Sequence, residues 1–143
     1  MKILVLGSGA REHAIILALV AEDAGHTIVA APCNAGIAAD VTTIALDAND
    51  PALVTEYATA NGFELVVVGP EAPLVAGVAN ALRAAGVPVF GPDQAAAELE
   101  GSKTFAKRIM DAASVPTGRA VHVGSASGKY RSHISLGAGA VKR

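Results

Sequence analysis

Short runs of apolar residues alternate along the chain with longer segments of helix-forming composition. The runs predict buried strands at residues 3–6, 26–31, 41–46, 65–68, 87–90 and 119–123. The segments between them predict helices at residues 14–21, 51–60, 74–85, 93–98 and 102–113. The clearest runs lack polar alternation, which is typical of strands covered on both faces. Strands that alternate with helices predict an α/β fold, with a Rossmann-like parallel sheet and helices on both of its faces.

Signals at helix ends support this division. Asp50 followed by Pro51 is a typical helix start, a capping side chain before a proline in the first turn. Gly25, Gly62 and Gly86 follow predicted helices at positions where glycine often ends a helix.

Four loops should meet at one edge of such a sheet, because ligands bind at the carboxyl ends of parallel strands. These loops are residues 7–12, 32–36, 69–74 and 91–93. The first loop, Gly7-Ser8-Gly9, leads from a strand into a helix, so its backbone N–H groups could face an anionic ligand. The alternative is a tight turn into a packed helix with no ligand.

Composition narrows the function classes. Hydrophobic residues make up 52% of the 143 residues and aromatic residues 3%, so the core must be built from Ala, Val, Leu and Ile. Residues 1–123 hold seven basic and all thirteen acidic residues, whereas residues 124–143 hold four basic residues and no acid. The chain therefore has neither a broad cationic surface nor an aromatic platform for nucleic acid. Residues 124–143 show no helix or strand period, and we expect a disordered basic tail there.

The chain carries the features of a cytoplasmic protein. Its single cysteine, Cys33, excludes an internal disulfide and fits a reducing compartment. No signal peptide is apparent after Met1-Lys2, and the apolar runs fall short of the roughly 20 residues that cross a membrane.

Two segments resemble nucleotide-binding motifs, but each departs from its motif at an important position. Glu12 stands where the third glycine of G-x-G-x-x-G belongs, and residues 30–32 lack the acidic residue expected on a ribose hydroxyl. Residues 124–130 suggest a P-loop, but they are one residue short and place Tyr130 where a magnesium-binding hydroxyl belongs. The sequence argues against NAD or FAD binding and against a P-loop.

Several polar residues remain as candidates. Arg11 could hold a phosphate, Glu12 an amine or hydroxyl, and His13 could act as a base, but Glu12 and His13 could equally cap the helix and bond locally. Asn34 suits either a turn or a ligand hydrogen bond. Glu71 lies between two prolines after a strand, and such a rigid loop favours a binding role.

Taken together, the loops resemble one family. The matching segments are Val5-Leu6-Gly7-Ser8-Gly9-Ala10-Arg11-Glu12-His13-Ala14, Ala31-Pro32-Cys33-Asn34-Ala35-Gly36, Val68-Gly69-Pro70-Glu71-Ala72-Pro73-Leu74, Phe90-Gly91-Pro92 and Leu99-Glu100-Gly101-Ser102-Lys103. In order and spacing they resemble glycinamide ribonucleotide synthetase, also called phosphoribosylamine–glycine ligase, of the ATP-grasp superfamily. The resemblance implies a pre-ATP-grasp domain of a purine-biosynthesis enzyme that joins glycine to phosphoribosylamine with ATP and magnesium or manganese.

The resemblance also implies roles for particular residues. The residues expected to bind the phosphoribosylamine are Gly7, Gly9, Arg11, Glu12, Asn34, Gly69 and Glu71. Lys103 matches a lysine that approaches the nucleotide phosphates. No catalytic residue and no metal ligand is expected within this chain, because the family places them in the ATP-grasp domain.

The resemblance divides the chain into three parts. Residues 1–100 are expected to form the substrate-binding domain, 101–123 the start of the linker or ATP-grasp region, and 124–143 a tail unlike the family. We therefore expect a truncation or frameshift near Gly124 and a fragment that is inactive by itself. Two alternatives stay open: a non-catalytic module that binds a phosphoribosyl group, and a related carboxylase or formyltransferase of purine synthesis. The two loops around Arg11 and Glu71 argue against the second.

Overall fold

The computed structural model describes residues 1–118, which fall into two compact units. The first unit comprises Met1–Ser102 and holds the sheet, and the second begins at Lys103. The strand expected at residues 119–123 and the tail expected at 124–143 lie outside the described residues.

The first unit is built on five strands. They are β1 (Lys2–Leu6), β2 (Thr27–Ala31), β3 (Thr42–Thr43), β4 (Leu65–Val68) and β5 (Val89–Phe90). All pairs are parallel and the order is β3-β2-β1-β4-β5, so the predicted parallel sheet is confirmed. The edge strands β3 and β5 are shorter than expected, with two residues each. An edge strand pairs on one side only, so fewer of its residues are held in the ladder.

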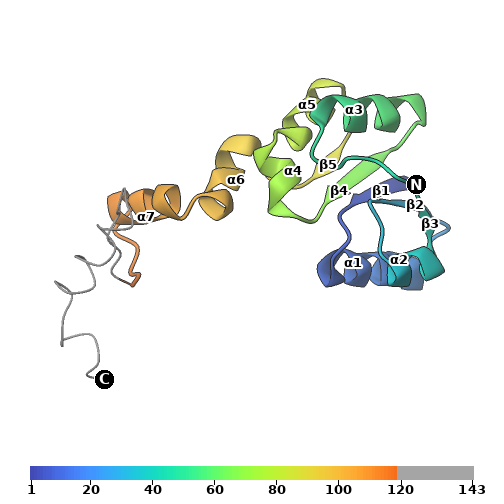
Figure 1. Ribbon diagram of the computed structural model, residues 1–143, viewed down its shortest axis with the longest axis horizontal. Coiled ribbons are helices and arrows are strands. Elements are labelled where there is room, and N and C mark those ends of the chain that lie inside the picture. Colours follow the sequence, from blue (N-terminus) through green and yellow to red (C-terminus); the bar gives the residue numbers. More distant parts are fainter. Residues whose placement is uncertain (119–143) are drawn as a thin grey trace, which may run out of the picture. The chain divides into compact units, whose positions relative to one another are not determined.

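Helices cover both faces of the sheet, as the sequence predicts. The helices are α1 (Ala10–Ala21), α2 (Ala35–Asp40), α3 (Pro51–Ala60), α4 (Glu71–Val75), α5 (Val78–Ala84), α6 (Gln94–Gly101) and, in the second unit, α7 (Lys103–Ala112). Figure 1 shows α1 and α2 on one face and α3 and α5 on the other. No helix among residues 1–118 is long and apolar enough to cross a membrane.

Successive residues of β1 enter two separate cores. Leu4 and Leu6 belong to the core beneath α3 and α5, whereas Ile3 and Val5 belong to the core beneath α1 and α2. All four side chains are almost fully buried. Because both faces are sealed, β1 needs no polar positions, which explains the uninterrupted apolar run.

The start of α3 follows the predicted chemistry. Pro51 is its first residue, and the Asp50 side chain accepts hydrogen bonds from Ala52 N at 2.9 Å and Leu53 N at 3.1 Å. Asp93 also precedes a helix, but its carboxylate makes no capping bond and pairs instead with the guanidinium of Arg83. The sequence predicts Asp93 as the cap of this helix. Asp93 does occupy the N-cap position of α6, but the expected capping bond from its side chain is not made.

Other predicted boundaries are corrected by the structure. The segment expected as one helix over 74–85 is two helices, because Gly77 between them has a left-handed φ of 91°. Glu71 begins α4 instead of lying in a loop, and α2 begins within the loop expected at 32–36. The first long helix begins at Ala10 and not at Ala14, so Arg11 and its neighbours form the first turn of α1.

The second unit contributes α7 to the described part of the chain. Its bounds are close to the predicted helix at 102–113, and none of its residues is buried. The Arg108 guanidinium lies 5.4 Å from the centroid of the Phe105 ring, and Lys107 Nζ donates to Thr117 Oγ1 at 2.6 Å.

Candidate functional site

The carboxyl ends of the central strands meet at one edge of the sheet. Leu6 of β1 lies opposite Ala31 of β2 and Val68 of β4. The next residues continue the ladder, since Gly7 N donates to Ala31 O at 2.9 Å and Gly69 N donates to Leu6 O at 3.2 Å. After β1 the chain continues to β2, which pairs with one edge of β1, and it returns later to β4, which pairs with the other edge. In open α/β sheets this change of direction is where ligands bind.

Glu12 occupies the space between the turns that follow β1 and β4. Its side chain is buried, and Oε2 accepts a hydrogen bond from Gly9 N at 2.7 Å. A Cβ on Gly7 would lie 2.6 Å from Glu12 Cγ, and a Cβ on Gly69 would lie 2.1 Å from Glu12 Oε1. Both glycines are therefore needed for the carboxylate to fit. Of the two roles that the sequence allows for Glu12, the structure contains the local hydrogen bond, which is the bond from Gly9 N. A contact between Glu12 and a ligand stays a prediction.

Arg11 and Asn34 tie the neighbouring loops together. Arg11 Nη1 donates to Gly69 O at 3.0 Å, which links the start of α1 to the turn after β4. Asn34 Nδ2 donates to Ser8 O at 2.7 Å, while Asn34 Oδ1 accepts from Ile37 N at 2.9 Å and caps α2. Asn34 thus makes the turn bond that the sequence left open, and it also contacts the β1–α1 turn.

His13 pairs with a residue that the sequence reasoning missed. His13 Nε2 lies 2.6 Å from Asp40 Oδ2, which joins α1 to the end of α2. A Cβ on Gly36 would lie 2.8 Å from His13 Cε1, so this glycine is needed where the helices approach. His13 therefore contacts another helix, at a residue 27 positions away in sequence, and its role as a base stays a prediction.

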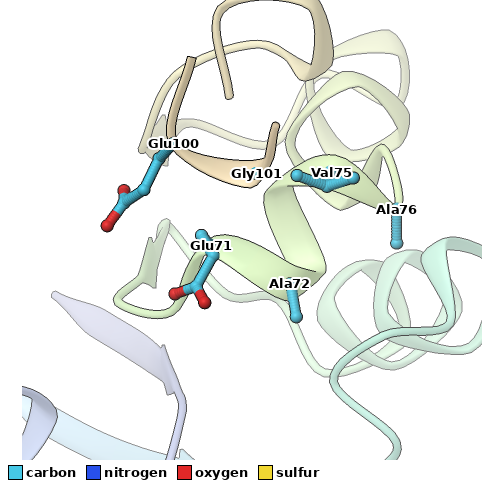
Figure 2. A pocket seen from close by; sticks show the side chains of 6 residues that line it. All are labelled: Glu71, Ala72, Val75, Ala76, Glu100 and Gly101. Carbon is cyan, nitrogen blue, oxygen red and sulfur yellow. The ribbon is translucent and has the colours of Figure 1, made fainter. Parts of the chain in front are cut away.

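Glu71 lines an open groove between α4 and α6. The groove has a volume of about 450 Å³ and is lined by Glu71, Ala72, Val75, Ala76, Glu100 and Gly101. Figure 2 shows the carboxylates of Glu71 and Glu100 extending toward the same side. Glu71 is exposed, so its carboxylate is free to meet a ligand at the first turn of α4. Two carboxylates favour an amine or hydroxyl group over an anion.

The predicted site residues therefore fall into two groups. Gly7, Gly9, Arg11, Glu12, Asn34 and Gly69 are joined by the contacts described above, and Glu71 follows two residues after Gly69. Lys103 belongs to the second unit, where it is the first residue of α7. Among residues 1–118, no three His, Cys, Asp or Glu side chains are grouped so that they could hold a metal ion.

Known proteins resemble this chain in sequence and fold. The family model described as phosphoribosylglycinamide synthetase, N domain, matches residues 1–100. A phosphoribosylamine–glycine ligase of Leifsonia xyli subsp. xyli is 75% identical over 122 residues, which cover 85% of this chain and 29% of the relative. Its counterpart in Streptomyces coelicolor is 57% identical over 119 residues, with 83% and 29% covered.

A solved structure agrees with these relatives. The crystal structure of phosphoribosylamine–glycine ligase from Thermotoga maritima has a TM-score of 0.60 and 30% identity, and the match covers 83% of this chain and 26% of that one. The chain thus spans about 29% of the length of the two curated relatives. The match over residues 1–100, with the sheet and its turns as described, shows that the chain belongs to the family of the phosphoribosylglycinamide synthetase N domain.

Proposed function

We propose that the chain is the substrate-binding N-terminal domain of a phosphoribosylamine–glycine ligase. The observation that carries this is the meeting of three turns, at residues 7–12, 34–36 and 69–71, in the part of the chain that the family model matches. The whole enzyme would form an amide bond between glycine and phosphoribosylamine, with ATP, in purine biosynthesis. Names of relatives that are 57% and 75% identical support this activity.

This chain's own residues would bind and orient the ribosyl substrate. The exposed Glu71 carboxylate suits a hydroxyl or amine of the ligand, and Arg11 holds the turn after β4 through the carbonyl of Gly69. The family implies ATP and a divalent metal for the whole enzyme. We assign to residues 1–118 the binding and orientation of the ribosyl substrate, and no catalytic step.

Replacing Glu71 by glutamine should weaken binding of phosphoribosylglycinamide, the product of the proposed reaction. The variant keeps the size of the side chain and loses a charge-assisted hydrogen bond, which is worth about tenfold in affinity. Isothermal titration of the full chain measures the change. Glu56→Gln is the matched control, because Glu56 is exposed on α3 and belongs to none of the three turns. Equal affinities of both variants and the unchanged chain would remove Glu71 from the site.

A second candidate function is a phosphoribosyl-binding module without chemistry. It rests on the same three turns, to which no catalytic step has been assigned. We expect the purified chain to bind phosphoribosylglycinamide but to show no ATP- and glycine-dependent ligation. A coupled assay that follows ADP release measures this. Turnover by the chain would refute the expectation, whereas ligation restored by adding the rest of a related ligase would favour the enzyme over the module.

A further inference from the structure

Glu12 is the one charged side chain that is buried among residues 1–118, with 4% of its surface exposed. A buried charge is costly unless hydrogen bonds satisfy it. The bond from Gly9 N to Glu12 Oε2, at 2.7 Å, supplies such a partner. Glu12 also lies in the first turn of α1, where the partial positive charge of the helix stabilises a carboxylate.

The same backbone N–H groups are those that bind phosphate in other turns between a strand and a helix. In this chain the N–H of Gly9 already donates a hydrogen bond to the Glu12 carboxylate. A phosphate oxygen that accepted a hydrogen bond from Gly9 N would have to displace the Glu12 carboxylate or lie in contact with it. The negative charges of the phosphate and the carboxylate would then repel each other strongly.

The glycines of the turn are explained by the same side chain. A Cβ on Gly9 would lie 2.8 Å from Glu12 Oε2, and Cβ atoms on Gly7 and Gly69 would lie 2.6 Å and 2.1 Å from atoms of Glu12. In a dinucleotide-binding turn, glycine lets the ligand approach the backbone. In this chain the glycines let Glu12 approach it.

We propose that Glu12 is a built-in anion, a positioning residue that locks the turn after β1 against the turn after β4 and excludes phosphate from it. Resting on the proposed function, this inference assigns the turn to a part of the ribosyl substrate that carries no negative charge. The phosphate of that substrate then binds away from Gly9.

The test follows the backbone amides of the full chain by NMR during titration with inorganic phosphate. In the unchanged chain, the amides of residues 7–11 should not respond to phosphate. Glu12→Gln keeps an oxygen that can accept from Gly9 N and removes the charge, so phosphate affinity at these amides should rise about tenfold or more. Glu56→Gln makes the same change of net charge on α3 and should leave the response unchanged.

The positioning role has a separate readout in hydrogen exchange. The Gly9 amide should exchange slowly in the unchanged chain, faster in Glu12→Ala, and slowly again in Glu12→Gln, because glutamine restores an acceptor. If Glu12 only filled space, the exchange rate of the Gly9 amide would not depend on whether residue 12 carries a hydrogen-bond acceptor.

Either of two results would overturn the inference: phosphate shifts the Gly9 amide of the unchanged chain, or Glu12→Gln gains no phosphate affinity. If Glu12→Gln does not fold, the unchanged chain still decides, since a silent and slowly exchanging Gly9 amide supports the inference. Titration with phosphoribosylglycinamide separates this outcome from the proposed function. If the chain binds phosphoribosylglycinamide but the amides of residues 7–11 also respond to inorganic phosphate, only the role of Glu12 is refuted. If these amides do not respond to phosphate and the chain does not bind phosphoribosylglycinamide, only the proposed function is refuted.

Discussion

Replacing Gly69 by alanine is expected to lower the free energy of unfolding by about 2–4 kcal/mol, as the sum of overpacking and a lost helix cap. The new Cβ would lie 2.1 Å from Glu12 Oε1 and 2.5 Å from Glu12 Cγ. Glu12 would have to leave its position and release Gly9 N. Urea unfolding followed by circular dichroism measures the change.

The double variant Gly69→Ala/Glu12→Ala tests the cause of that loss. If the clash with Glu12 is responsible, the double variant loses less stability than the sum of the two single variants. Gly118→Ala is the control, because no atom lies within 4 Å of its Cβ position. Additive losses in the double variant would place the effect of Gly69 elsewhere.

Replacing Leu82 by alanine is expected to destabilise the fold by about 2–5 kcal/mol. Leu82 lies on α5, has no exposed surface, and belongs to the core that also contains Leu4 and Leu6 of β1. Truncation leaves a cavity that this closely packed core cannot fully close. The measurement is again the midpoint and slope of urea unfolding.

Leu53→Ala provides the matched comparison for Leu82. Leu53 lies on α3, which covers the same face of the sheet, but 47% of its surface is exposed. Its truncation should change the stability by no more than about 0.5 kcal/mol. Similar losses for both leucines would contradict the assignment of Leu82 to the core.

Much of the fold could be predicted because apolar runs mark central strands well. The strand at residues 65–68 and the helix at 51–60 have the predicted bounds, and the parallel sheet with helices on both faces is confirmed. The predicted start of α1 is four residues late. Its capping acceptor is Glu12, which folds back from inside the helix, so no Ser, Thr, Asp or Asn marks the boundary.

The remaining errors have similar local causes. The single helix predicted at residues 74–85 runs across the end of α4 and all of α5 because Gly77 is tolerated within helical patterns, but the left-handed backbone of Gly77 separates the two helices. The Asp93 side chain bonds to Arg83, ten residues earlier, and this tertiary contact replaces the predicted cap.

The site was predicted as a set of loops but not as a set of contacts. The rule that parallel strands end at one edge brings the turns after β1, β2 and β4 together, as the register shows. The bonds of this region join residues far apart in sequence. Between turns they join Arg11 to Gly69 across 58 positions and Asn34 to Ser8 across 26, and between α1 and α2 they join His13 to Asp40 across 27. A single sequence carries no periodic signal for such pairs.

The two sealed faces of β1 have a consequence for how the sheet is aligned. Sliding β1 by one residue would exchange Ile3 and Val5 with Leu4 and Leu6, and every position would still be apolar. Hydrophobicity therefore gives β1 little protection against slippage along its neighbours. Glu12 contacts the glycines at the end of β1, and these contacts fit only the observed position of the turn, so we expect them to favour the observed alignment over a shifted one.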